Sequence, residues 1–133
     1  MVRAYPGQIA KYGQALNKNT CETLTTSKPL TAGLFVGYAE SGVKELNGEQ
    51  IKGVIVRSVL KDTFENGEPV DVMSIGIGDG IWVQVASDVS VARGDKVSPV
   101  KTGAEAGKVN KEVGDEVYIV EEVSGDLALI TKQ

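Results

Sequence analysis

The sequence predicts an all-β protein with a small barrel or sandwich-like body of about eight short strands, preceded by an extended N-terminal arm. The first observation is an alternation of apolar and polar residues with a period of two, which is clearest between Gly67 and Val97 and is typical of strands. The second is a series of turn dipeptides rich in Gly, Asn and Asp that separates these runs at short intervals. This regular spacing of strands and turns favours a barrel or a sandwich.

The first part of the chain lacks this pattern. Residues 1–30 combine prolines and glycines with a polar middle, and we expect them to form an extended arm. A short helical face is present in this part, but Gly13 and the strand-rich remainder favour a docked irregular segment over a stable helix. We therefore divide the chain into an arm, residues 1–30, and a single-domain β-rich body, residues 31–133.

The body is punctuated by turns that each suit a positive φ or a tight reversal. The expected strands cover residues 33–39, 53–60, 70–75, 81–86, 89–92, 95–100, 116–123 and 127–133. The turn dipeptides are Asn47-Gly48, Asn66-Gly67, Asp79-Gly80, Gly94-Asp95, Gly114-Asp115 and Gly125-Asp126. The glycine-rich sequence GIGDG, residues 76–80, is followed by a strand instead of the helix that a phosphate-binding loop requires. We interpret it as a hairpin turn.

Length and charge limit the possible partners. A chain of 133 residues fits one domain with one modest core. Arg3, Lys11 and Lys18 give residues 1–21 a charge of +3, and because the whole chain carries −4, the remainder carries −7. This balance argues against direct nucleic-acid binding, which depends on clustered cations. The cationic segment suits either an acidic protein surface or a solvated terminus.

The residue types argue against an enzyme. Histidine is absent, and Cys21 is the single cysteine, so neither a disulfide within the chain nor a cysteine zinc site is available. Most aspartates lie in turns, and the serines lack a nucleophile elbow, so a carboxylate or serine–lysine hydrolase is the one enzymatic hypothesis left. No catalytic, metal or cofactor site and no small-molecule substrate is predicted. The chain has no apolar run that suggests a signal peptide or a membrane partner, and we expect it to fold in a reducing cytoplasm.

Two residues keep alternatives open. Lys96 in GDKVS weakly resembles the modified lysine of lipoyl or biotinyl carriers, so a small cytoplasmic carrier or ligand-binding β-domain, with Lys96 or GIGDG as its site, is the alternative function. Trp82 shares its strand face with Gln84, where an aromatic side chain often marks an interface. The other interpretation of Trp82 is a strand buried on both faces in a barrel closed by its own arm.

The order of several short motifs resembles the structural cement, or head decoration, proteins of tailed bacteriophages. These motifs are AYPGQ at residues 4–8, GLFVGYA at 33–39, GEPVDVMSIGIGDGIWVQVA at 67–86 leading into VARGDKV at 91–97, the Gly107-Lys108 loop and a final valine-rich hairpin. The resemblance implies a virion protein, made in the host bacterial cytoplasm, that binds as a homotrimer to the outer surface of the expanded capsid. Its partner would be the major capsid protein, and its activity would be mechanical, clamping neighbouring capsid subunits against the pressure of packaged DNA.

Under this hypothesis the arm docks on the capsid or on a neighbouring cement subunit. Tyr5 is expected to anchor it, because tyrosine offers amphipathic contact area with few rotatable bonds, and Pro6 lowers the ordering cost of the unbound arm. The candidate interface residues are Arg3, Ala4, Tyr5, Pro6, Gly7, Gln8, Ile9, Tyr12 and Trp82.

Overall fold

The structure is a computed structural model that describes residues 4–11, 19–111, 114 and 116–132. These residues form thirteen strands and no helix, which confirms the all-β class. Five strands form a closed barrel in the order β2-β5-β4-β6-β8. Its members are β2 (Asn19–Thr25), β4 (Phe35–Tyr38), β5 (Val43–Glu45), β6 (Ile51–Ile55) and β8 (Pro69–Met73).

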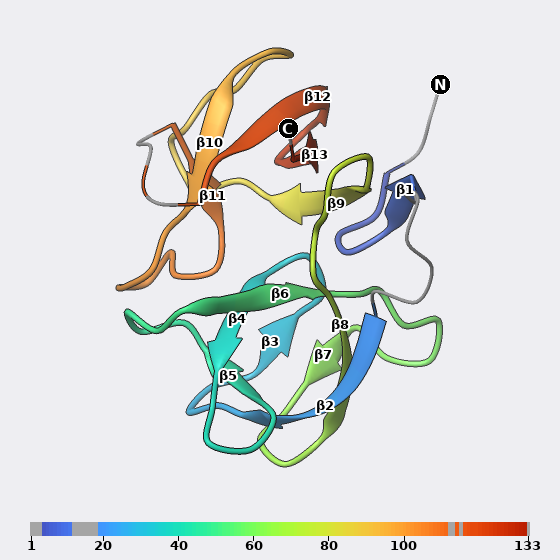
Figure 1. The fold of residues 1–133 in the computed structure, drawn as a ribbon, viewed down its shortest axis with the longest axis vertical. Coiled ribbons are helices and arrows are strands. Elements are labelled where there is room, and N and C mark those ends of the chain that lie inside the picture. Colours follow the sequence, from blue (N-terminus) through green and yellow to red (C-terminus); the bar gives the residue numbers. More distant parts are fainter. Residues whose placement is uncertain (1–3, 12–18, 112–113, 115, 133) are drawn as a thin grey trace.

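The second layer is a six-stranded sheet in the order β1-β9-β13-β12-β10-β11, which lies above the barrel in Figure 1. Its strands are β1 (Ile9–Lys11), β9 (Gly80–Gln84), β10 (Lys96–Pro99), β11 (Val109–Asn110), β12 (Tyr118–Ser124) and β13 (Leu127–Thr131). A short ladder joins β3 (Leu30–Thr31) to β7 (Thr63–Phe64). The strand pairs are antiparallel except for β2 with β5, which is parallel.

The barrel and the sheet share a core. The side chains of Phe35, Val54 and Met73 point out of the barrel toward the sheet. There they pack with Ile81 and Val83 in one buried cluster. On each of these three strands, a neighbouring side chain points the opposite way, into the barrel interior. These side chains are Val36 on β4, Ile55 on β6 and Val72 on β8. Strands β4, β6 and β8 are therefore buried on both faces, and each such side chain stabilises the fold by roughly 1.5–3 kcal/mol relative to exposure.

The N-terminal third of the chain differs from the sequence-based expectation. Asn19–Thr25, expected to be part of an irregular arm, is a full barrel strand that pairs with β8 and β5. Only Leu24 of this strand is buried, so hydrophobic periodicity gave no signal. The three β-branched threonines of this segment, Thr20, Thr23 and Thr25, were the available indication of a strand. The division of the chain into an arm and a body remains a prediction.

Two further local expectations were wrong. GIGDG is not a hairpin turn, because β8 belongs to the barrel and β9 to the sheet, so residues 74–79 cross between the two layers. Residues 89–92 form no strand and instead pass along the surface between β9 and β10. Their alternating valines pack against the shared core without strand pairing. The expected positive φ angles were correct at Gly48 and Gly67, with values of 91° and 86°.

Candidate interaction site at the N-terminal arm

The motif AYPGQ forms a compact turn. The amide of Gln8 donates to the carbonyl of Tyr5 at 3.1 Å, and the Gln8 side-chain oxygen accepts from the Tyr5 amide at 3.1 Å. Pro6 and Gly7 occupy the two central positions, and Gly7 has a φ of +74°. Proline followed by a residue with positive φ is the pattern of a type II turn, so this local shape is dictated by the sequence.

Main-chain hydrogen bonds fasten the turn to both layers of the protein. The Gly7 amide donates to the Trp82 carbonyl at 2.7 Å, and the Trp82 amide donates to the Gln8 carbonyl at 2.9 Å. On the other side, the Arg57 amide, just beyond β6, donates to the Gly7 carbonyl at 2.9 Å. Ile9 then pairs with Ile81, which makes β1 the edge strand of the sheet. We call residues 4–11 the seated arm.

The contact between the AYPGQ turn and the protein body requires glycine at two positions. A Cβ atom on Gly7 would lie 2.6 Å from the carbonyl oxygen of Ile55 and 2.8 Å from the amide of Arg57. Gly33 lies against the turn from the opposite side, where its own Cβ would come within 3.0 Å of the Gly7 amide and of Pro6. The close approach of these two backbones leaves no room for a side chain at either position.

Trp82 lies beneath the start of the seated arm. Its side chain is only 4% exposed and packs with Leu127 and Leu129, and Ala4 packs against this small cluster. Ile81 and Val83, on either side of it, face the shared core, so β9 is buried on both faces. The burial on both faces agrees with the second interpretation of Trp82, but β9 belongs to the six-stranded sheet and not to a barrel closed by the arm. A role of Trp82 in an interface with a partner remains a prediction.

A hollow adjoins the arm at the junction of the barrel and the sheet. The guanidinium of Arg57 lies over the Tyr5 ring, 4.2 Å from its centroid, a cation–π geometry. Tyr5 and Arg57 form part of the wall of a cavity of about 400 Å3, whose lining also includes Gln84, Asp126 and Leu127. The arm therefore contributes to the outer surface as well as to the fold.

The structure brings most of the predicted interface residues together. Ala4, Tyr5, Pro6, Gly7, Gln8, Ile9 and Trp82 lie in one continuous region, whereas Arg3 and Tyr12 lie outside the described residues. The contacts described for the first group of residues are with the protein's own body. Contact of any of the predicted residues with a capsid remains a prediction. Sequence reasoning missed Arg57 and Gly33, because both sit inside runs that were interpreted only as strands.

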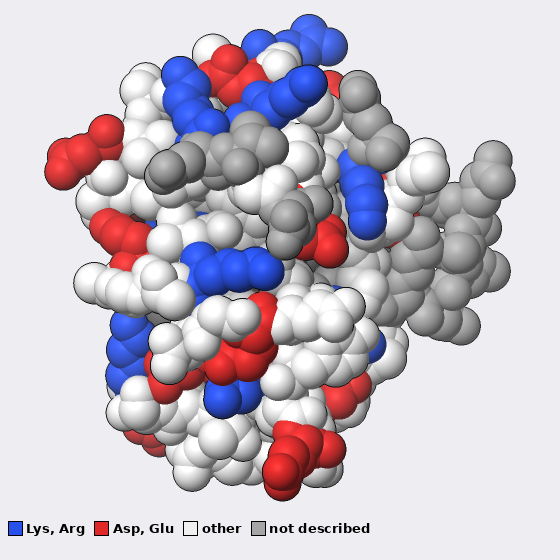
Figure 2. Space-filling view, turned by 60° about the vertical axis from the view of Figure 1, so that its left-hand side comes forward, with Lys and Arg blue, Asp and Glu red and all other residues white. Residues whose placement is uncertain are grey.

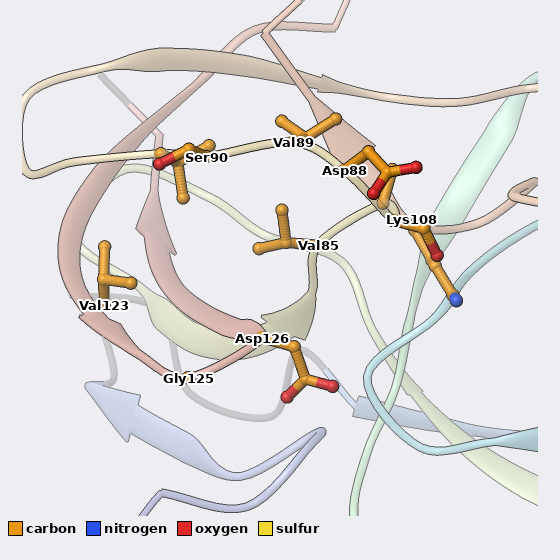
Figure 3. A pocket seen from close by; sticks show the side chains of 11 residues that line it. Val85, Asp88, Val89, Ser90, Lys108, Val123, Gly125 and Asp126 are labelled. Atoms are coloured by element: carbon orange, nitrogen blue, oxygen red, sulfur yellow. The ribbon is translucent and has the colours of Figure 1, made fainter.

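A second hollow, of about 360 Å3, lies beside the end of β9 and the turn between β12 and β13. Figure 3 shows Val85, Val89, Ser90 and Val123 around this space, with Asp88, Asp126 and Lys108 near its edge. Lys108 is paired with Glu105, with 3.0 Å between Nζ and Oε2. Hydrogen bonds from the Ser87 side chain and from Lys108 hold the pKa of Glu105 at about 2.

The two features of the carrier alternative have structural roles. Lys96 is the first residue of β10 and pairs with Ile119, so it does not stand at the tip of a hairpin as a modified lysine would. In GIGDG the buried carboxylate of Asp79 accepts from the Gly76 amide at 2.9 Å, and the Asp79 amide donates to the Gly76 carbonyl at 3.1 Å. These bonds close a tight local turn.

The surface was compared with the requirements of a charged patch, a metal site and a membrane span. On the face in Figure 2, basic and acidic side chains are interspersed over both layers. Within the part of the chain that the structure describes, no group of three or more His, Cys, Asp or Glu side chains is placed to hold a metal ion. The same part has no helix long and apolar enough to cross a membrane. Cys21 is exposed on β2.

The described residues form an all-β body whose candidate interaction site is held by main-chain hydrogen bonds and apolar packing. Comparison with known families is specific: residues 1–131 match the XM1 gp53 minor capsid protein family, and the chain belongs to this family of phage capsid proteins. The family-level resemblance to phage capsid-associated proteins is confirmed.

Among solved structures, a chain in the capsid of Myoviridae phage XM1 is similar, with a TM-score of 0.70 and 17% sequence identity over 96% of this chain and 88% of that chain. At this identity the likeness establishes a shared fold. No curated protein matches the chain.

Proposed function

We propose that the protein binds the outer surface of the expanded phage capsid as a homotrimer and clamps neighbouring major capsid subunits against internal DNA pressure. The observation that carries this proposal is the family match, which extends over residues 1–131. The fold agrees with a mechanical role, since the described part of the chain is held together by main-chain pairing and apolar packing.

The clamp follows from thermodynamic linkage. A protein that binds only the assembled, expanded lattice stabilises that lattice by its binding free energy, as any ligand stabilises the state that it prefers. When one protein bridges two capsid subunits, the subunits can separate only if its contacts with one of them break, so its binding free energy opposes their separation. No bond is made or broken, so the role needs contact area and geometry alone.

Trimerisation is proposed because one arm is a small contact. A seated arm of eight residues offers a few hundred Å2, below the roughly 1,000 Å2 that a specific interface needs. Three linked copies bind as one multivalent ligand, and the second and third contacts then form at a high effective concentration. Capsid affinity and trimer formation are therefore expected to be coupled.

The test is co-sedimentation of the purified protein with expanded heads that lack it. Saturable binding at a fixed ratio of copies to capsid subunits, with increased resistance of the heads to heat, is the expected result. Tyr5→Ala is expected to weaken binding, and Tyr38→Ala is the matched control. Tyr38 also lies near a cation, Lys52, but its amide bonds to Gln50 just before β6, whereas the arm bonds to Arg57 just after β6. Absence of binding to any head form would refute the proposal.

A further inference from the structure

Two loops next to barrel strands carry the same reactive dipeptide. Asn47-Gly48 lies between β5 and β6, and Asn66-Gly67 lies between β7 and β8 (Figure 1). In an asparagine–glycine pair the glycine amide nitrogen can attack the side-chain carbonyl carbon of the asparagine, because glycine has no side chain to hinder the approach. The other three asparagines of the chain precede lysine or threonine. These two turns are therefore the places to compare for spontaneous deamidation.

The reaction needs water and hydroxide as its only co-reactants. Hydroxide takes the proton of the glycine amide, the nitrogen bonds to the asparagine Cγ, and the bond from Cγ to Nδ2 breaks as ammonia leaves with a proton from water. Water then opens the resulting succinimide ring at either of its two carbonyls, which leaves aspartate or isoaspartate. The net reaction consumes water, releases ammonia and adds a negative charge to the chain.

The two turns match in the features that set their intrinsic reactivity. Each dipeptide is followed by a glutamate, in the sequences LNGE and ENGE. The asparagine and the glycine are exposed in both turns, and a Cβ on either glycine would meet no atom within 4 Å, so water reaches both. Glu49 of the first turn pairs with Lys44 at 3.2 Å. Glu68 of the second turn pairs with Lys61. Local sequence, access and charge thus predict similar rates at the two sites.

The fold holds both reacting groups at Asn66. Its side-chain Oδ1 accepts a hydrogen bond from the Thr26 amide at 3.0 Å, which fixes the carbonyl that would be attacked. The Gly67 amide, which would be the nucleophile, donates to the carbonyl of Leu24 at 2.7 Å. The Leu24 amide donates in return to the Glu68 carbonyl at 2.9 Å, so the turn continues the ladder between β2 and β8. Attack at Asn66 therefore requires the end of this ladder to open.

At Asn47 the fold holds the nucleophile alone. The Gly48 amide donates to the carbonyl of Lys101 at 2.9 Å, and Lys101 lies in the loop that follows β10. The Asn47 amide donates to Glu49 Oε1 at 2.6 Å, but the Asn47 side chain has no hydrogen-bond partner among the described residues. Once the single bond between the two loops opens, the side chain is free to turn its carbonyl carbon toward the Gly48 nitrogen.

We propose that Asn47 is a spontaneous modification site of the folded protein, which deamidates through a succinimide, and that the barrel protects Asn66 from the same reaction. Local opening must precede attack at both turns, but Asn66 must also release its side chain from Thr26. One additional hydrogen bond of typical net strength changes an opening equilibrium by about fivefold, so Asn66 should react at least about fivefold more slowly than Asn47.

The reaction at Asn47 changes a contact between the two layers. In the succinimide the Gly48 nitrogen carries no hydrogen, so its bond to Lys101, which joins a barrel loop to a sheet loop, is absent while the ring lasts. Hydrolysis to aspartate restores the amide, whereas isoaspartate leaves the main chain of the turn longer by a carbon atom. Either product adds a carboxylate to an already acidic chain, so ion exchange separates it from the native protein.

The test is a time course of the purified full chain in mildly alkaline buffer, once folded and once in urea. Acidic forms are separated by ion exchange and located by peptide mapping with mass spectrometry. The two sites should react at similar rates in urea, and in the folded protein Asn47 should react at least about fivefold faster than Asn66. Asn47→Gln should remove the main acidic form of the folded protein, because glutamine closes its larger ring slowly. Asn66→Gln is the matched control and should leave that form in place.

Three results would overturn the proposal. The first is a folded protein in which Asn66 reacts as fast as Asn47 or faster. The second is a folded protein in which neither site reacts while both react in urea, since Asn47 would then be protected as well. The third is an equal rate difference in urea, because local sequence would then explain the order without the fold. Mapping of the wild-type chain decides among these results even if a glutamine variant fails to fold, and none of them depends on capsid binding.

Discussion

Gly7→Ala tests whether the arm is an integral part of the fold. The residue has a φ of +74°, and its missing Cβ would lie 2.6 Å from the Ile55 carbonyl and 2.8 Å from the Arg57 amide. These neighbours are backbone atoms of a barrel strand and its continuation, so they are not free to move aside. The turn must therefore lift, which lengthens the bonds from Gly7 to Trp82 and from Arg57 to Gly7.

The magnitude follows from these parts. A left-handed alanine costs about 1–2 kcal/mol, and each weakened main-chain bond costs about 1 kcal/mol. We expect Gly7→Ala to lower the free energy of unfolding by about 3–4 kcal/mol, a large part of the 5–15 kcal/mol typical of a domain. Gly48→Ala is the matched control, because Gly48 has a φ of +91° with no atom within 4 Å of its added Cβ, and about 1 kcal/mol is expected there.

Urea denaturation followed by the fluorescence of Trp82, the single tryptophan, measures both effects. Because Ala4 packs against the Trp82 cluster, a lifted arm is also expected to shift the native emission to longer wavelength before unfolding begins. The control should keep the native spectrum. Equal destabilisation by the two substitutions, with no spectral change in Gly7→Ala, would refute the assignment of residues 4–11 to the fold.

Three other predictions concern the body. Burial raises the pKa of the Tyr118 phenol above its ordinary value of about 10. The folded protein therefore holds this proton more tightly than the unfolded chain, so the free energy of unfolding is retained below about pH 10 and falls as the pH rises further. Tyr118→Phe should reduce this alkaline loss in denaturation measured at several pH values. The Glu105 carboxyl should titrate near its pKa of about 2 by NMR, and Ser87→Ala should raise that pKa by removing its largest hydrogen-bonding contribution. An unshifted Glu105 midpoint would contradict the contact. Gly53→Ala should strongly destabilise the barrel in thermal unfolding, because the added Cβ would meet the backbone oxygen of Met73.

The strand-rich body was predictable because its signals are local. The alternation in VDVM and IWVQV and the glycine turns at Gly48 and Gly67 depend only on neighbours in sequence, and the structure has strands and positive φ angles there. The turn chemistry of AYPGQ is also local, since proline followed by glycine defines its shape. These elements could be placed without knowing their partners.

The arrangement of the layers could not be predicted in this way. GIGDG has the composition of a hairpin turn, but whether the flanking strands pair is decided by the shared core between the barrel and the sheet. The strand at Asn19–Thr25 is recruited by pairing with β8, although only Leu24 of it is buried. Arg57 became part of the arm site because the chain returns to Gly7 after β6, a contact between residues fifty positions apart.

The seating of the arm constrains how it would contribute to the proposed capsid binding. A partner that binds the seated form gains contacts without paying to release the bonds between Gly7, Gln8, Arg57 and Trp82, and it stabilises the fold by its own binding free energy. A partner that binds a released arm must first offset the seating energy of about 2–3 kcal/mol that separates Gly7→Ala from its control, a factor of roughly 30 to 150 in affinity. Weakening the seat therefore acts in opposite directions: it lowers affinity if the capsid binds the seated arm and raises it if the capsid binds a released one. Head binding by Gly7→Ala, compared with Gly48→Ala, thus identifies which form of the arm the capsid recognises.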